Sequence, residues 1–201
     1  AFSGGKDSVA IKALADMAGV KYDAHYNLTT VDPPELVNFI RKSYPDVITD
    51  MPKETMWQLI VDERVPPTRL MRYCCRALKE RGGGGRFCIT GVRWAESVMR
   101  KNKRARIEIN SMTKNQIMLN NDNDEARRVM ETCAMKSKHI LNPIIGWTDE
   151  DVWEFIRRYK IQYCELYDQG FKRLGCIGCP MASRKEKLYQ FERWPKHYQA
   201  Y

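Results

Sequence analysis

Apolar residues follow two patterns along this chain of 201 residues. In one pattern they recur about three or four residues apart, which predicts amphipathic helices. In the other they form short continuous runs between turn residues, which predicts buried strands. The predicted helices cover residues 9–18, 34–43, 54–62, 69–80 and 149–159, and the predicted strands cover 1–2, 22–27, 47–51, 86–90 and 142–145. This alternation predicts an α/β fold with a doubly wound, mainly parallel sheet.

Proline, glycine and threonine mark several of the predicted boundaries. Pro33-Pro34 opens one helix, Gly19 ends another, and Thr148 caps a third whose first turn is acidic. Residues 99–124 are polar and rich in lysine, arginine and asparagine, so we expect a long loop or insertion there. Residues 162–201 are expected to form an irregular cysteine-bearing segment and a final helix.

Length and apolar content set the expected organisation. A soft prior of about 150 residues per domain favours one domain with a small appendage. We expect an α/β domain over residues 1–160 and a C-terminal segment over 161–201 packed on it. Residues 1–2 are interpreted as the end of a strand that starts earlier, and 194–201 as an unfinished helix with a tail beyond it. No apolar run approaches the roughly 20 residues that span a bilayer, and no leader opens the chain, so no membrane partner is expected.

Charge and cysteine content narrow the expected partners and compartment. The chain carries 34 Lys+Arg against 25 Asp+Glu, a formal charge of +9. Such a balance favours an anionic partner such as a nucleotide, a nucleic acid or an acidic protein. The seven cysteines are too few for a disulfide scaffold and odd in number, so a reducing cytoplasm is expected. A homo-oligomer is compatible with all of these features.

Residues 3–8 read Ser-Gly-Gly-Lys-Asp-Ser and lie between a strand end and a helix start. Glycines let backbone N–H groups turn toward a phosphate, and the helix N-terminus, a lysine and hydroxyls add charge and donors. The spacing differs from a Walker A loop, and an ordinary Gly-Gly turn with a serine cap is the alternative. Because glycines, a lysine and hydroxyls occur together at a helix start, the sequence predicts a phosphate-binding loop made of Ser3, Gly4, Gly5, Lys6, Asp7 and Ser8.

A second polar element follows the strand predicted over 86–90. Gly91 ends that strand, so Arg93 is expected at the C-terminal edge of the sheet, where it can reach an anionic group. Glu96 is expected either to fix the Arg93 guanidinium or to bind a metal. An Arg-Glu surface pair is the alternative. Residues 100–106 then place five positive charges in seven positions, which suggests either a flap over a polyanionic substrate or a solvated loop.

Cys74 and Cys75 are adjacent, and Cys176 and Cys179 form a CxxC pair. Four thiolates can hold either zinc or an iron–sulfur cluster. Adjacent cysteines disfavour a single zinc ion, because two neighbouring side chains must converge on it, whereas a cubane lets each thiolate take a different iron. The remaining cysteines are expected to be core residues, namely Cys88, Cys133 and Cys164.

The loop at 3–8 resembles the motif of the PP-loop ATP pyrophosphatases, in the adenine nucleotide α-hydrolase-like superfamily. The segments 90–97, 142–153 and 167–180 resemble the phosphoadenosine phosphosulfate (PAPS) reductase family, in order and over nearly the whole length. The resemblance implies ATP or another adenine nucleotide at the loop with Mg²⁺ alongside, and a four-iron four-sulfur cluster on Cys74, Cys75, Cys176 and Cys179. We expect Lys6, Asp7 and Arg93 to be catalytic, and Gly91, Arg93 and Glu96 to bind nucleotide together with residues 3–8.

Two enzyme reactions compete. The family's reductases, as the resemblance implies, usually have a degenerate phosphate loop and a cysteine near the C-terminus that attacks an activated sulfate. Here the loop is intact and no cysteine follows Cys179. We therefore favour adenylation by ATP coupled to sulfur transfer, with a sulfur donor protein or thiol reductant as partner and nucleic acid as a candidate acceptor. PAPS or adenylyl-sulfate reduction with sulfite release is the first alternative, and a non-catalytic, metal-stabilised nucleic-acid-binding module is the second.

Overall fold

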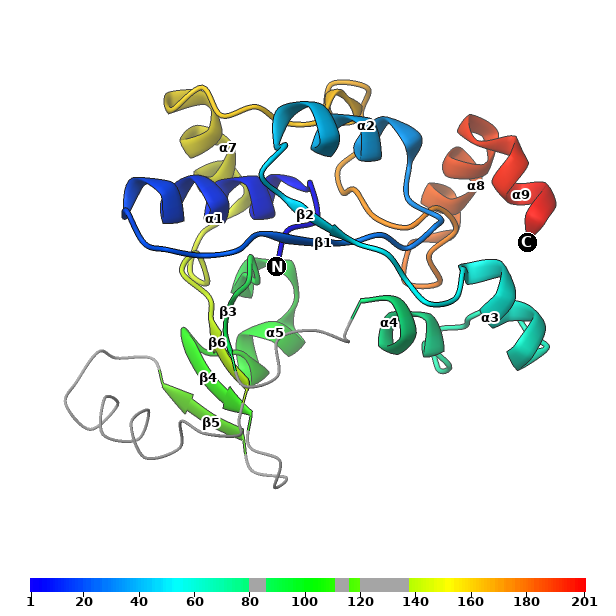
Figure 1. Ribbon diagram of the computed structural model, residues 1–201, viewed down its shortest axis with the longest axis horizontal. Helices are drawn as coiled ribbons and strands as arrows, with labels where there is room; N and C mark the ends of the chain where they lie inside the picture. Colours follow the sequence, from blue (N-terminus) through cyan, green and yellow to red (C-terminus); the bar gives the residue numbers. More distant parts are fainter. Residues whose placement is uncertain (80–85, 111–115, 120–137) are drawn as a thin grey trace. The chain divides into compact units, whose positions relative to one another are not determined.

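The computed structural model describes residues 1–79, 86–110, 116–119 and 138–201 (Figure 1). The chain divides into two compact units, each assembled from separate stretches of sequence. The first unit comprises Ala1–Phe2, Lys6–Tyr22 and Gly83–Tyr163, and the second comprises Ser3–Gly5, Asp23–Gly82 and Cys164–Tyr201.

The first unit is built on a four-stranded sheet in the order β3-β6-β4-β5. Its strands are β3 (Phe87–Ile89), β4 (Ile107–Asn110), β5 (Gln116–Leu119) and β6 (Lys138–Leu141). β3 pairs with β6 in parallel, whereas β4 is antiparallel to both of its neighbours. Its helices are α1 (Lys6–Met17), η1 (Trp94–Glu96), α5 (Val98–Lys103) and α7 (Asp149–Arg158). α1 packs against α7, and both helices bury apolar side chains, among them Val9, Ala10, Val152 and Ile156.

The second unit holds a two-stranded parallel sheet of β1 (His25–Asn27) and β2 (Ile48–Asp50). Its helices are α2 (Pro34–Ser43), α3 (Met56–Glu63), α4 (Tyr73–Leu78), η2 (Glu165–Tyr167), α8 (Arg184–Arg193) and α9 (Pro195–Ala200). An apolar cluster between α3 and α4 buries Val31, Met56, Leu59, Tyr73, Cys74 and Leu78.

The α/β class predicted from the sequence is confirmed. The helix predicted over 34–43 is α2, and the predicted cap Thr148 accepts a hydrogen bond from the Asp151 backbone at the start of α7. The helix predicted over 69–80 begins only at Tyr73, because Thr68 and Met71 form a turn in which each residue hydrogen-bonds the other.

The prediction of a loop over residues 99–124 is wrong for the described part of that stretch. α5 begins after Ser97, whose side chain accepts a hydrogen bond from the Arg100 backbone, and β4 and β5 follow. Glu108 shows why composition misled, because it is polar and yet only 1% exposed, with its carboxylate hydrogen-bonded inside the unit.

Two further boundaries differ from the prediction. The strand predicted over 142–145 lies earlier, as β6, and residues 142–147 form turns in which Ile144 and Ile145 are nonetheless buried. The single helix predicted at the C-terminus is two helices, α8 and α9, which divide at Trp194 because Pro195 lacks the N–H that would continue the first.

Of the cysteines expected in the core, Cys164 is buried and Cys88 is half-buried, while Cys133 lies outside the described residues. Among the helices that the structure describes, none combines the length and apolar character needed to cross a membrane.

Candidate functional site

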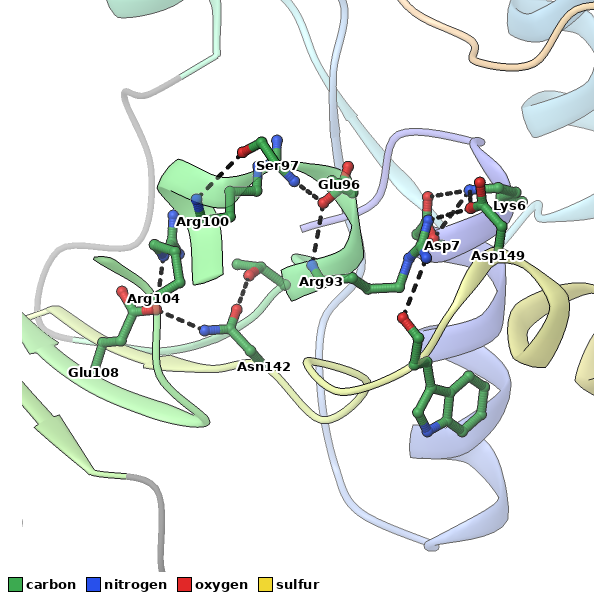
Figure 2. Close-up of polar contacts among 12 residues, drawn as sticks. Lys6, Asp7, Arg93, Glu96, Ser97, Arg100, Arg104, Glu108, Asn142 and Asp149 are labelled. Atoms are coloured by element: carbon green, nitrogen blue, oxygen red, sulfur yellow. Dashed lines mark hydrogen bonds and ion pairs between the residues drawn. The ribbon is translucent and has the colours of Figure 1, made fainter. Parts of the chain in front are cut away.

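Arg93 forms the centre of a polar group in the first unit (Figure 2). Its side chain is only 2% exposed, and its guanidinium donates to three acceptors. Nε donates to Asp7 at 2.6 Å, Nη2 to Asp149 at 2.5 Å and Nη1 to the Trp147 carbonyl at 3.3 Å. Arg93 therefore connects the segment after β3 to the first turns of α1 and α7.

Lys6 is the second buried cation of this group. It is the first residue of α1, and its ammonium lies 3.1 Å from Asp7 and 3.0 Å from Asp149. The cations are buried, whereas the Asp7 and Asp149 side chains are 25% and 63% exposed. Burial tends to raise the pKa of Asp149, but hydrogen bonds from Lys6 and Arg93 outweigh it and hold the pKa below its usual value.

Lys6, Asp7 and Ser8 form the first turn of α1, where backbone N–H groups point toward the N-terminal end of the helix. These groups and the helix dipole favour an anion at this end. The loop residues before them, Ser3, Gly4 and Gly5, belong to the second unit. There Gly4 has φ +71°, and a Cβ on it would lie 2.7 Å from Leu36 and 2.8 Å from Ile40, so a glycine is required.

Gly91 lies directly against α1. A Cβ at this position would be 3.0 Å from the Asp7 Cβ and 3.2 Å from the Asp7 carbonyl. The glycine thus allows the segment after β3 to approach the first turn of α1, and this approach brings Arg93 to Asp7.

Glu96 lies beside Arg93 but does not fix its guanidinium, so that part of the prediction is wrong. Glu96 Oε2 accepts a 3.1 Å hydrogen bond from the Arg93 backbone N–H and forms an ion pair with Arg100. The guanidinium is held instead by two aspartates, and Glu96 acts on the backbone of the same segment.

Asp149 is the residue that the sequence analysis missed. Its position in the acidic first turn of a capped helix gave it a sufficient structural explanation. In the structure β6 is parallel to β3, so the segments after both strands leave at the same edge of the sheet. Polar residues after β6 were as much candidates for the site as Arg93 after β3.

Residues 100–103 of the basic run belong to α5, and residues 104–106 connect this helix to β4. Arg100 pairs with Glu96, and Arg104 pairs with the buried Glu108 at 2.7 Å. Lys101 and Lys103 are exposed on α5. Arg100 and Arg104 of the predicted flap therefore contact carboxylates of the same unit.

The cysteines predicted as ligands all lie in the second unit. Cys74 is buried, and Cys75 and Cys176 pack against the same apolar cluster. A hydrogen bond with the Cys75 side chain, aided by burial, raises the pKa of the Cys74 thiol, and burial raises that of Cys176. Cys179 follows in a turn where its N–H donates to the Cys176 carbonyl.

The surroundings of Tyr201 include three of these four cysteines. Burial is the main cause of its raised pKa, and the charges of Cys176, Cys74 and Cys179 add to it. In the part of the chain that the structure describes, no group of three or more His, Cys, Asp or Glu side chains is arranged to hold a metal ion.

Comparison with known proteins identifies the family. The family model for the phosphoadenosine phosphosulfate reductase domain matches residues 1–182 of this chain. The chain belongs to this family. Among solved structures, it resembles phosphoadenylyl-sulfate (PAPS) reductase from Candida auris in its phosphate complex, with a TM-score of 0.54 and 16% identity over 87% of this chain and 80% of that one. This likeness concerns the fold.

Two curated relatives illustrate the range of the family. An uncharacterized protein of Methanocaldococcus jannaschii is 28% identical over 97% of this chain and 44% of its own length. The adenosine 5′-phosphosulfate reductase of Staphylococcus epidermidis is 26% identical over 84% of this chain and 61% of its own length. The chain thus spans less than two thirds of these relatives.

Proposed function

We propose that this chain is an enzyme that binds an adenine nucleotide at Lys6 and Arg93 and uses ATP to adenylate an acceptor for sulfur transfer. The observation that carries the proposal is the pair of buried cations beside the first turn of α1, in a sequence whose phosphate-loop motif is intact. Buried, preorganised cations stabilise charge on a phosphate more strongly than solvated ones do.

The charges of the group favour a nucleotide that carries Mg²⁺. Lys6 and Arg93 are balanced by Asp7 and Asp149, so the formal sum is zero and bare ATP gains little net attraction. The two carboxylates are the more accessible members, and carboxylate oxygens are ligands that Mg²⁺ prefers. Asp7 and Asp149 thus fit a Mg²⁺ ion, which when bound would neutralise phosphate charge.

The proposed reaction breaks the bond between the α- and β-phosphates of ATP. An acceptor oxygen attacks the α-phosphorus, a new P–O bond forms, and pyrophosphate leaves. Lys6 and Arg93 offset the negative charge on the phosphates, and the N–H groups of the first turn of α1 bind the phosphate oxygens. Nucleic acid as the acceptor stays a prediction from the sequence.

We further propose that Cys74, Cys75, Cys176 and Cys179 bind a four-iron four-sulfur cluster. The donor set supports this, because Cys74, Cys75 and Cys176 lie in or against one apolar cluster, and thiolates suit iron–sulfur clusters. Such a cluster would supply electron transfer or sulfur carriage. Zinc is the alternative occupant of the same four thiols.

Reduction of an activated sulfate is a second candidate function, favoured by the relatives whose names describe adenosine 5′-phosphosulfate reductases. In that reaction two thiols supply two electrons and become a disulfide, while the sulfate leaves AMP as sulfite. The phosphates of the adenine nucleotide would contact the same two cations, Lys6 and Arg93.

Product analysis separates the candidates. Reconstituted protein is incubated with Mg·ATP and, separately, with adenylyl sulfate or PAPS plus a thiol. Pyrophosphate release from ATP, lost in Lys6→Ala and kept in the exposed control Lys21→Ala, supports adenylation. Sulfite release with no turnover of ATP supports the reductase and overturns the first proposal. Nucleic-acid binding that survives Lys6→Ala, without turnover of either nucleotide, supports the binding module.

A further inference from the structure

Glu108 is a buried carboxylate that lies outside the phosphate loop, the segment 90–97 and the cysteine pairs. It lies on β4 and is 1% exposed. Its Oε1 accepts from Arg104 Nε at 2.7 Å and from Asn142 Nδ2 at 2.8 Å (Figure 2), and also from the Ala105 N–H at 3.2 Å. These donors, one of them cationic, compensate the buried charge, and removing that charge leaves them poorly satisfied.

Asn142 connects Glu108 to the segment that carries Arg93. Its side-chain amide donates to Glu108 and, at 2.7 Å, to the Ala105 carbonyl. Its Oδ1 accepts a hydrogen bond from the Thr90 hydroxyl. Thr90 precedes Arg93 by three residues, and its backbone is also fixed, because its N–H donates to the Leu141 carbonyl.

Trp94 anchors the other side of Arg93. Its indole Nε1 donates 2.8 Å to the carbonyl of Arg104, the residue whose side chain pairs with Glu108. Its backbone N–H donates 2.8 Å to the Ile145 carbonyl. Arg93 therefore lies between Thr90 and Trp94, two residues that are both tied to the same buried polar network.

From this arrangement we infer that Glu108 is a positioning residue for Arg93, acting through Asn142 and Arg104. The inference rests on the proposed function in one respect, namely that Arg93 binds nucleotide phosphate. Glu108 touches none of the proposed reacting groups. It holds the backbone on both sides of Arg93, so that the guanidinium reaches Asp7 and Asp149 in one orientation.

The first test needs no nucleotide. The Nε–H of Arg93 is buried and donates 2.6 Å to Asp7, so its nuclear magnetic resonance signal should exchange slowly with water. The signal is assigned by its absence in Arg93→Lys. In Glu108→Gln, its exchange should accelerate by about tenfold or more, because local opening no longer requires breaking the network. The exposed Glu154→Gln in the same unit should leave it unchanged.

The second test measures coupling. Glu108→Gln should weaken Mg·ATP binding about tenfold in the wild-type background, since small misplacement of a positioned group is costly. In the Arg93→Lys background the same change should have little further effect, although it still lowers the melting temperature in both. A purely structural Glu108 would lower the melting temperature and leave the Arg93 exchange rate and the affinity of folded protein unchanged, which overturns the inference.

Thr90→Val provides a milder variant in case Glu108→Gln folds poorly. It removes the hydrogen bond to Asn142 while leaving Glu108 and Arg104 paired, and it should accelerate the Arg93 exchange in the same direction. If wild-type protein binds no adenine nucleotide, the proposed function fails, while the exchange measurement still decides the role of Glu108. Slow exchange of the Arg93 signal in both variants contradicts the inference.

Discussion

Arg93 Nε donates a 2.6 Å hydrogen bond to Asp7 Oδ1, although 86 positions separate the two residues in sequence. The bond joins the segment after β3 to the first turn of α1, and Gly91 makes the approach sterically feasible. Asp7 and Asp149 balance the charges of Arg93 and Lys6.

Asp149→Asn should change how ATP binding depends on Mg²⁺. The substitution leaves the group with one excess positive charge, so ATP in the presence of EDTA should bind about tenfold more tightly than to wild type. The enhancement by Mg²⁺ should shrink, because one proposed ligand is lost. Calorimetry measures both, with Glu150→Gln in the same helical turn as the control. Identical behaviour of the two variants would contradict the proposed balance.

Gly4→Ala should destabilise the protein by about 1–3 kcal/mol, the usual cost of forcing extra atoms into a packed site. Gly4 has φ +71°, and its added Cβ would press on Leu36 and Ile40, each only 1% exposed. Gly146→Ala is the control, because a Cβ there meets nothing within 4 Å. Urea unfolding should resolve the two variants, and equal stabilities would remove the steric argument for Gly4.

Stability should fall as the pH drops through the titration of His197. Burial lowers the pKa of His197, so the unfolded chain binds a proton more readily than the folded one. The contribution is fully present above the ordinary histidine pKa of about 6.5 and is lost as the pH falls through the lower folded-state value. The urea midpoint, measured from about pH 7.5 to 5, should decline less steeply in His197→Phe than in wild type.

Anaerobic reconstitution should yield about four irons and four sulfides per chain, with absorbance near 400 nm. Substituting serine for any one of Cys74, Cys75, Cys176 and Cys179 should reduce the iron content. Cys88→Ser should not, because Cys88 lies on β3 in the other unit. A colourless protein that retains zinc would support the alternative occupant of these thiols.

Local sequence signals were sufficient to predict helices that begin at a proline or at a side-chain cap. Pro33-Pro34 marked the start of α2, and Thr148 marked the start of α7, because a proline or a side-chain cap acts within one helical turn. The loop motif likewise predicted Lys6 and Asp7 as site residues, and their side chains form an ion pair in the structure.

Ion pairs and hydrogen bonds between residues of different elements could not be predicted in the same way. From the sequence alone, Glu108 is expected at the surface. Its burial is explained by Arg104 and Asn142, which donate hydrogen bonds to its carboxylate. The partners of Arg93 were missed for the same reason, since its acceptors lie on α1 and α7 rather than at Glu96. Pairing of this kind depends on strand order and register, which the hydrophobic pattern alone leaves open.

The most direct test of the central claim is calorimetric titration of Mg·ATP into wild type, Lys6→Ala, Arg93→Lys and the exposed control Lys21→Ala. We predict binding by wild type and by Lys21→Ala. We also predict a loss of affinity of about tenfold or more in Lys6→Ala and in Arg93→Lys, because a lysine lacks the planar fork of donors that arginine presents. Undiminished binding in both of these variants would contradict the claim that the two buried cations bind the nucleotide.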